Sequence, residues 1–427
     1  MKKIKLAIIG SGSTYTPELI EGIISKKDVL PISQLDLMDI DDRKLNIVGG
    51  LVQRMIKAAG IPCKVQLTKS LDEALRDADF VLCQIRVGKL PARVLDEKIP
   101  LKYNLIGQET NGIGGFFKGM RTIPVMMDIA HHMEKLCPEA WLINFTNPSG
   151  MIAEALLNNS SVKTIGVCNV PINMIDSIKN KLNLHDAEFD YVGLNHLSWV
   201  TSIRANGKDY LNEAINQGIN SQAMQNIPAK GFSLELIKAL GAIPSSYLEY
   251  YYFKDAKLQK AKEAEKCRGE VCIDIEEQLL QIYSNNELHV KPELLSRRGG
   301  ARYSEVALNL VDSIYNDKRD IQVVNILNNN TLDFMAPNDA VEISAIIGKS
   351  GAEPIKINVD NDHIKEMMRM IKSYEKHAVT AALSGDEDEA IRALLINPLV
   401  GDYNKAYSCF QELKEAHKRY LPQFYKR

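Results

Sequence analysis

Cys168 and His196 are the two residues whose side-chain chemistry stands out first. Cys168 ends a strand-like run within "TIGVCNVPI", and His196 lies in "GLNHLSW". A cysteine thiolate is a nucleophile or a soft metal ligand, and a neutral imidazole binds many metal ions. Their spacing matches no zinc-finger pattern. A buried apolar cysteine and a hydrogen-bonded core histidine are the alternative, and these two residues alone leave both interpretations open.

A glycine-rich turn near the N-terminus could bind a phosphate group. Within "IIGSGSTYTPELI", Gly10, Gly12, Ser13 and Thr14 stand between a predicted strand and a predicted helix. Such glycines let the backbone approach a pyrophosphate, and the helix N-terminus offers free N–H groups. The third glycine of the usual fingerprint is missing, but Asp39 ends the next strand, where a carboxylate binds an adenosine ribose. We predict NAD rather than NADP, because a carboxylate repels a 2′-phosphate; a turn without a cofactor is the alternative.

Three further polar clusters follow predicted strands. "QIRVGKLPARVLDEKIP" carries Arg86 and Arg93, "GQETNGIGGFFKGMRTIPV" carries Glu109 and Arg121, and "NFTNPSG" carries Asn147. In open α/β sheets, ligands bind beyond the carboxyl ends of the strands, and arginine binds carboxylate or phosphate groups. Each residue alone is typical of a surface loop. The three clusters together favour one ligand site.

The elements that must position these residues form two predicted regions. The first 170 or so residues alternate strand-like and helix-like patterns, which indicates a parallel sheet with crossover helices. The alternation weakens after residue 175 or so, where "FDYVGLNHLSWVTSI" indicates a strand in mixed structure and later segments are helical in composition. We therefore predict a cofactor-binding domain over residues 1–172 and a second domain over 173–427, with a shared interface.

Composition excludes several classes of function. The chain has 427 residues and a formal net charge of -2, so it lacks the positive charge of a protein that binds nucleic acid or anionic membranes. No apolar run approaches the roughly 18 residues of a membrane span. The seven cysteines are scattered, which is not a disulfide framework and favours a reduced, cytoplasmic protein.

These motifs together resemble the NAD-dependent glycosidases of glycoside hydrolase family 4, and most closely the 6-phospho-β-glucosidases. The shared blocks are "IIGSGSTYTP", "IRVGK", "GQETNGIGG", "NFTNPSG", "CNVP", "GLNH" and "YLEYYYF". The resemblance implies a fold of the lactate and malate dehydrogenase type. A Rossmann-type domain would precede a mixed α/β, helix-rich domain for substrate, metal and oligomerisation. It also implies a homodimer or homotetramer.

The resemblance assigns roles to four of the residues. Cys168 of C-x-x-P and His196 of N-H would bind a divalent metal ion, usually Mn²⁺. Tyr247, which begins the Y-L-x-Y-Y motif, would be the catalytic base, and Glu109 would increase its basicity. Because manganese is an uncommon partner for cysteine, substrate hydroxyls would have to complete the shell, and the metal should bind weakly without the sugar.

Four residues match positions that bind the substrate: Arg93, Asn147, Asn169 and, on the short stretch "KCRGEV", Arg268. Asn169 also marks the subfamily. Members that resemble 6-phospho-α-glucosidases carry an aspartate acid after the cysteine, whereas those that resemble 6-phospho-β-glucosidases carry asparagine. With Asn169 in that place, no residue is assigned to protonate the leaving group.

The implied reaction is a hydrolysis with an internal redox cycle. NAD⁺ takes a hydride from C3 of the glucosyl ring of a 6-phospho-β-glucoside, and Tyr247 removes the acidified C2 proton. The C1 oxygen then leaves, water adds, and the hydride returns. The products are glucose 6-phosphate and an alcohol or sugar. The alternatives are a 6-phospho-α-glucosidase, an α-galactosidase, an NAD-linked hydroxyacid dehydrogenase, or a non-catalytic NAD sensor.

Overall fold

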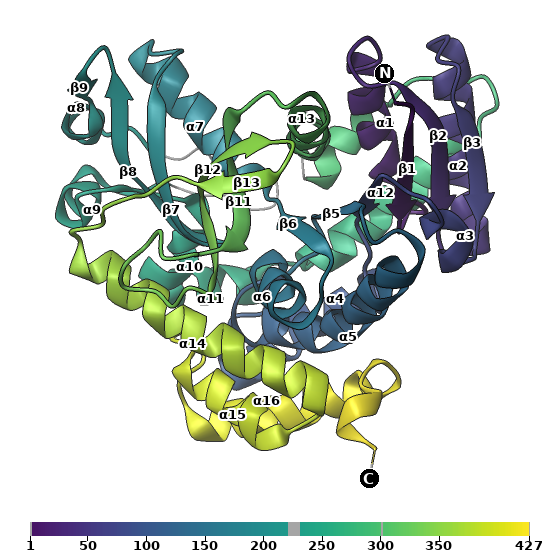
Figure 1. Cartoon of the computed structure of the whole chain (residues 1–427). Helices are drawn as coiled ribbons and strands as arrows, with labels where there is room; N and C mark the ends of the chain where they lie inside the picture. The colour runs from purple at the N-terminus through teal and green to yellow at the C-terminus, as the bar shows by residue number, and fades with distance from the viewer. Residues whose placement is uncertain (1, 221–230, 300–301, 427) are drawn as a thin grey trace.

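The computed structural model of the protein describes residues 2–220, 231–299 and 302–426. Within these residues the strands form one continuous sheet in the order β10-β8-β7-β12-β11-β6-β5-β4-β1-β2-β3, with β13 beside β12 and β9 beside β8 (Figure 1). The strands are β1 (Ile4–Ile9), β2 (Ile32–Met38), β3 (Lys64–Thr68), β4 (Phe80–Cys83), β5 (Trp141–Asn144), β6 (Lys163–Gly166), β7 (Glu188–Leu194), β8 (Leu197–Ala205), β9 (Lys208–Asp209), β10 (Ile243–Pro244), β11 (Asp320–Leu327), β12 (Ala340–Gly348) and β13 (Gly351–Pro354).

The helices connect these strands and cover the sheet. They are α1 (Thr16–Ser25), α2 (Asp42–Ala58), α3 (Leu71–Leu75), α4 (Lys89–Lys98), α5 (Gly112–Leu136), α6 (Ser149–Asn159), α7 (Asn169–Leu182), α8 (Leu211–Asn216), α9 (Leu234–Leu240), α10 (Glu249–Tyr252), α11 (Lys254–Glu263), α12 (Arg268–Tyr283), α13 (Tyr303–Asn316), α14 (Asp362–Ser384), α15 (Glu387–Ile396) and α16 (Tyr403–Ala416). Short 3₁₀ helices are η1 (Pro100–Tyr103), η2 (Ser246–Leu248), η3 (Glu293–Arg298), η4 (Lys418–Tyr420) and η5 (Pro422–Phe424). None of the described helices is long and apolar enough to cross a membrane.

The N-terminal half is a doubly wound parallel sheet. Its strand order, β3-β2-β1-β4-β5-β6, is that of a Rossmann fold, and every pair within it is parallel. β1 and β4 are fully or almost fully buried, as apolar strands covered on both faces should be. The parallel sheet predicted from the alternating pattern is therefore confirmed.

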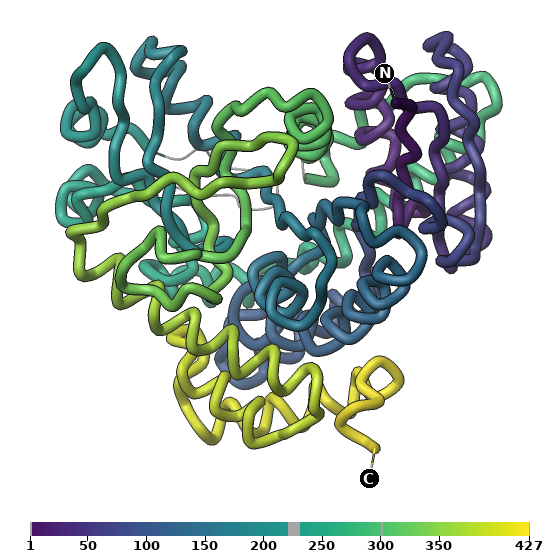
Figure 2. The backbone as a smooth tube through the Cα atoms, in the orientation of Figure 1, coloured from purple at the N-terminus to yellow at the C-terminus, as the bar shows by residue number. Residues whose placement is uncertain are grey.

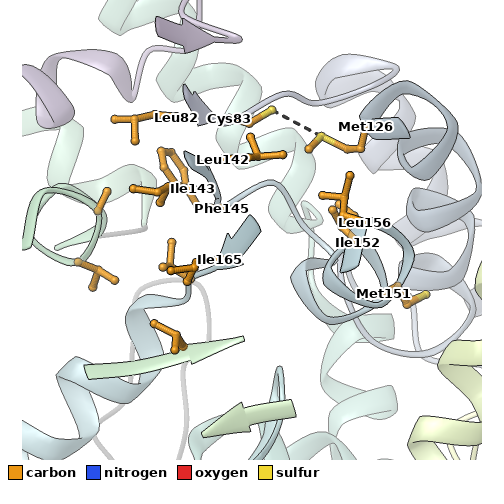
Figure 3. Close-up of a cluster of buried hydrophobic side chains, with 14 of the residues drawn as sticks. Leu82, Cys83, Met126, Leu142, Ile143, Phe145, Met151, Ile152, Leu156 and Ile165 are labelled. Carbon is orange, nitrogen blue, oxygen red and sulfur yellow. Dashed lines mark hydrogen bonds between the residues drawn. The ribbon is translucent and has the colours of Figure 1, made fainter. Parts of the chain in front are cut away.

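A hydrophobic core lies between this sheet and its helices. Figure 3 shows a part of it, where Cys83 of β4 and Leu142 of β5 face Met126 of α5, on the side where Ile152 and Leu156 of α6 lie. The side chains drawn there are buried, and Cys83 Sγ lies 3.5 Å from Met126 Sδ. Burial of this kind stabilises the fold by about 25 cal/mol for each Å² of apolar surface removed from water.

The two halves of the sheet meet at a narrow seam. β11 joins β6 in antiparallel fashion through a single residue pair, Asn325 and Gly166, and β12 then pairs with both β11 and β7. Between the two halves, a later segment of the chain also packs against the N-terminal half: Tyr303, at the start of α13, packs its ring edge-on against Tyr15. In the backbone trace, the green segment of α13 accordingly lies close to the purple N-terminal segment (Figure 2).

The single strand predicted over "FDYVGLNHLSWVTSI" is wrong in one respect. The segment forms two antiparallel strands, β7 and β8, joined by the two-residue turn Asn195–His196. His196 has a φ of 67°, in the left-handed region. His196 therefore lies in a turn at the tip of a hairpin, not within a strand.

Candidate active site

The turn between β1 and α1 is built for close approach of a ligand to the backbone. Gly10 has a φ of 84°, and a Cβ there would lie 3.0 Å from the backbone of Gln84. The Gly12 N–H donates to Asp39 Oδ2 at 2.8 Å, and a Cβ on Gly12 would lie 2.8 Å from that same oxygen. A side chain at Gly10 would be strained and would crowd the backbone, and one at Gly12 would displace the Asp39 carboxylate. The sequence-predicted pair of turn and carboxylate is thus in contact.

A cavity of about 660 Å³ opens beside this turn. Gly10, Gly12, Ser13 and Asp39 line it, together with residues from the loops after β4 and β5. Thr14 does not line it: its side chain is buried, and its carbonyl accepts a hydrogen bond from Tyr283 Oη at 2.7 Å. The volume, the glycines and the carboxylate fit a dinucleotide, because a turn without side chains leaves room for a pyrophosphate.

Glu109 lies on the cavity wall among three basic side chains. Its carboxylate pairs with Arg86, with Lys118, and with Arg93 Nη1 at 2.7 Å. Although burial raises the pKa of Glu109, the charges of Arg86, Arg93 and Lys118 hold that pKa well below its usual range. Burial and the charge of Arg86 lower the pKa of Lys118 to about 7. Arg93 Nε also pairs with Glu97 Oε1 at 2.7 Å, so two carboxylates face the three basic side chains. Arginine side chains at this wall favour the binding of an anionic ligand.

The loop that carries Glu109 is held rigid by Gln108. Gln108 Oε1 accepts from the N–H groups of Thr110 and Asn111, at 2.6 and 2.7 Å, and from the Thr110 hydroxyl at 2.9 Å. The Thr110 hydroxyl therefore donates its one proton to Gln108. Thr110 Oγ1 lies 2.9 Å from His196 Nδ1 and so accepts a hydrogen bond from the Nδ1–H group. This hydrogen bond selects the tautomer that leaves the Nε2 lone pair of His196 free.

Cys168, His196 and Tyr247 are brought together behind this loop. Cys168 Sγ lies 3.6 Å from His196 Nε2, and the Tyr247 ring stacks on the His196 ring with centroids 3.5 Å apart. All three are buried. Burial raises the pKa of the Cys168 thiol to about 12, and burial lowers the pKa of His196 to about 3, so the imidazole is neutral. Burial also raises the pKa of Tyr247 well above its usual range.

The Cys168–His196 pair fits a metal ion. The thiol sulfur and the unprotonated Nε2 are no farther apart than two ligands of one ion, and Thr110 orients the imidazole as partners of metal-bound histidines do. No group of three or more His, Cys, Asp or Glu residues within residues 2–220, 231–299 and 302–426 could hold a metal ion. A metal ion held by this pair would have further coordination positions, which oxygen atoms of a substrate could occupy.

Of the four residues predicted to bind the substrate, two line the cavity and two do not. Arg93 and Asn147 line the cavity, and Asn147 precedes a cis peptide bond to Pro148. Asn169 is buried at the first position of α7, next to Cys168. Arg268 does not line the cavity; its Nη2 donates to the carbonyls of Arg297 and Arg298 at 2.9 and 2.8 Å.

Lys118, Arg298 and Tyr303 also line the cavity and were not predicted from the sequence. Lys118 lies in the long helix α5, where a lysine is usually a solvent-facing residue. Arg298 ends η3, and Tyr303 begins α13, far along the chain from the other site residues. The one signal that could have indicated Arg298 is its place in "SRRGG", a basic pair before two glycines.

Comparisons with known proteins give the same assignment over the whole chain. Residues 5–184 match the family 4 glycosyl hydrolase model, and residues 191–400 match the model of its C-terminal domain. The chain is 44% identical to the probable 6-phospho-beta-glucosidase of Bacillus subtilis (strain 168), which covers 99% of this chain and 98% of the relative. It is 43% identical to the 6-phospho-beta-glucosidase of Escherichia coli (strain K12), over 99% and 97%.

Solved structures agree with these sequence matches. The 6-phospho-beta glucosidase of Thermotoga maritima with manganese, NAD⁺ and glucose-6-phosphate is 31% identical, with a TM-score of 0.89 over 98% of this chain and 99% of that chain. Malate dehydrogenase from Plasmodium falciparum has a TM-score of 0.56 at 13% identity over 90% of this chain, which shows a shared fold. The predicted dehydrogenase-type fold and the resemblance to family 4 are both confirmed. The chain belongs to the family 4 glycosyl hydrolases.

Proposed function

We propose that this chain hydrolyses 6-phospho-β-glucosides to glucose 6-phosphate and an alcohol or sugar, with NAD and a divalent metal ion such as Mn²⁺. The observation that carries the proposal is the stack of Tyr247 on His196, beside Cys168 and next to the glycine-lined cavity. The relatives above support the β-linked, phosphorylated substrate, because the one from Escherichia coli is a 6-phospho-beta-glucosidase and the one from Bacillus subtilis is named a probable 6-phospho-beta-glucosidase. Asn169 agrees with the same subfamily.

When bound, NAD supplies a hydride acceptor at C3 of the glucosyl ring, and the metal ion supplies positive charge that polarises the C3 ketone and favours the ionised form of Tyr247. The Tyr247 oxygen takes the proton from C2, and the oxygen at C1 leaves by elimination. Burial is the main cause of the raised pKa of Tyr247, and the charge of Glu109 raises it further, so the ionised form of Tyr247 is a stronger base. Water adds across the C1–C2 bond, and return of the hydride to C3 restores the alcohol there, so the net reaction is hydrolysis.

Arg93 and Asn147 would contact the sugar, since both face the cavity. The roles of Asn169, Arg268 and Thr14 stay predictions. A hydroxyacid dehydrogenase would need a histidine paired with a carboxylate, whereas Nδ1 of His196 faces the Thr110 hydroxyl.

The proposal also includes a division at residue 172, a homodimer or homotetramer, and a cytoplasmic location. The location is supported by the seven cysteines, all of which lie in the described residues and are free thiols.

The test of the substrate assignment is a comparison of four chromogenic sugars. We expect the enzyme to hydrolyse 4-nitrophenyl β-glucoside 6-phosphate, and to leave the α-linked and the unphosphorylated forms almost untouched. Activity should require both NAD⁺ and Mn²⁺, although no net oxidation occurs. Full activity after exhaustive removal of nucleotide and metal would exclude the redox mechanism. A preference for the α-linked or unphosphorylated sugar would exclude the substrate class but not the mechanism.

Gly12→Ala should weaken NAD binding. The added Cβ would lie 2.8 Å from the Asp39 carboxylate, so Asp39 has to move and its hydrogen bond to the ribose is lost. A hydrogen bond to a charged group contributes about 1.5–3 kcal/mol, so we expect the Kd of NAD⁺ to rise about 10-fold to 100-fold. Titration by calorimetry measures it. Gly50→Ala on α2 is the matched control, because its Cβ would meet only the Arg54 side chain, at 3.4 Å. An unchanged Kd in Gly12→Ala would place the cofactor elsewhere.

A further inference from the structure

Glu342 is a buried carboxylate at the seam of the sheet. It lies in β12, opposite Asn325 of β11 and Gly193 of β7, and its side chain is almost wholly buried. Among the described residues it forms no ion pair with a basic side chain. Asn195 Nδ2 and Asn325 Nδ2 donate to Glu342 Oε1 at 2.9 and 3.1 Å. Burial of a carboxylate costs free energy unless hydrogen bonds satisfy it, so the presence of Glu342 at this buried position calls for a reason.

The two amides connect Glu342 to both members of the Cys168–His196 pair. Asn195 precedes His196 in the hairpin turn, and its side chain forms a hydrogen bond with the Cys168 thiol. Burial and the charge of Glu342 raise the pKa of this thiol, and the hydrogen bond from Asn195 lowers it. Asn325 Nδ2 also donates to the carbonyl of Gly166, two residues before Cys168, at 3.4 Å. One carboxylate thus holds the turn that carries the histidine and the strand that leads to the cysteine.

The local backbone explains why this support is needed. His196 adopts a left-handed φ of 67°, which a residue other than glycine holds only when its surroundings impose it. β6, which leads to Cys168, meets the other half of the sheet through the pair Asn325 and Gly166 alone. Without a residue that contacts both segments, the distance between Cys168 Sγ and the His196 imidazole would depend on this one strand contact.

We propose that Glu342 is a positioning residue that fixes the distance between Cys168 Sγ and His196 Nε2, chiefly through the side chain of Asn195. The proposal rests on the proposed function only in taking this pair as the metal site. Glu342 does not touch the metal or the sugar, and acts by holding Asn195 and Asn325 in the orientations in which their amides face it.

Glu342→Gln tests this role with the smallest change in shape. Both amides donate to the same oxygen, Oε1, so a glutamine oxygen in its place can accept from each, but without the negative charge that strengthens such hydrogen bonds; if the glutamine turns its NH₂ group toward the two donors, both contacts are lost. Weakening of such an outer partner typically lowers metal affinity about 10-fold to 100-fold. We expect a rise of that size in the Kd of Mn²⁺, measured on the full chain with NAD⁺ present from the electron paramagnetic resonance of free Mn²⁺. NAD affinity should not change.

Asp312→Asn is the matched control, because it also removes a buried carboxylate: Asp312 lies on α13 and pairs with Lys26 and Lys318. It should leave the Kd of Mn²⁺ unchanged. Asn195→Ala should weaken Mn²⁺ binding as much as Glu342→Gln does, and the double variant should lose little more than Asn195→Ala alone. Equal Mn²⁺ affinity in Glu342→Gln and the unaltered enzyme, or fully additive losses, would overturn the proposal.

A readout without metal separates this proposal from the proposed function. Cys168 is buried, and release of the hairpin turn should expose it. Alkylation of Cys168 by iodoacetamide, followed by mass spectrometry, should be faster in Glu342→Gln than in the unaltered enzyme or in Asp312→Asn. If the unaltered enzyme binds no Mn²⁺, the proposed function fails, while the alkylation rates still decide the role of Glu342. Equal rates would then reject it.

Discussion

Tyr247→Phe should lower the rate of hydrolysis by about 10²-fold to 10⁴-fold, which is the contribution of a positioned base. The variant deletes only the hydroxyl that takes the C2 proton and keeps the ring that stacks on His196. The fold should survive, because phenylalanine fills the same buried space. Reduction of NAD⁺ by the C3 hydride is an earlier step and should persist. The measurements are steady-state hydrolysis and single-turnover absorbance of NADH.

Tyr252→Phe is the matched control for this prediction. Its hydroxyl lies 3.0 Å from His363 Nε2, away from the Cys168–His196 pair. If Tyr247→Phe stays active while the same change at Tyr250, Tyr251 or Tyr252 abolishes turnover, the mechanism stands and the assignment of the base is wrong.

Exchange with solvent tests the elimination itself. The unaltered enzyme in D₂O should place deuterium at C2 of the released glucose 6-phosphate, because reprotonation draws on the medium. Product free of deuterium would exclude elimination, unless Tyr247 returns a fully shielded proton.

Cys168→Ser and His196→Ala should each remove metal-dependent hydrolysis while NAD binding stays nearly intact. A metal ion that polarises a carbonyl contributes several kcal/mol, so the loss should be at least about 100-fold. Neither residue lines the cavity, which is why the cofactor should still bind. Activity across Mn²⁺ concentrations and NAD⁺ titration measure the two effects. Cys63→Ser controls for the loss of a thiol, since Cys63 lies near the start of β3. Normal hydrolysis by both variants would make Cys168 a buried apolar residue after all.

The sequence predicted the N-terminal half well because its strands are apolar on both faces. β1 and α1 begin and end close to the predicted runs, since a strand buried on both faces and a helix with Pro17 at its start have strong local patterns. The turn at His196 has no such pattern. Asn195 and His196 stand between two apolar runs without a glycine, and only the left-handed φ of His196 reveals the reversal.

The sequence indicated the cavity residues that belong to contiguous motifs. It did not indicate those that reach the cavity from distant segments of the chain. The Gly12–Asp39 contact follows from a single β-α-β unit. Lys118 and Arg298 reach the cavity only because α5 and η3 pack there, which no local pattern encodes. Arg268 was predicted from a short motif match; its guanidinium contacts the carbonyls of Arg297 and Arg298, and its role in substrate binding stays a prediction.

The narrow seam between β6 and β11 has a consequence for motion. A sheet that continues through both halves resists a hinge, because bending it breaks hydrogen bonds between strands. The fewest such bonds are at risk at the junction of Asn325 and Gly166, where one residue pair spans the gap. Twisting about that line would change the angle between the nucleotide half and the hairpin that carries His196. The Asn325–Gly166 pair therefore bears both on the relative motion of the two halves and on the distance between Cys168 and His196.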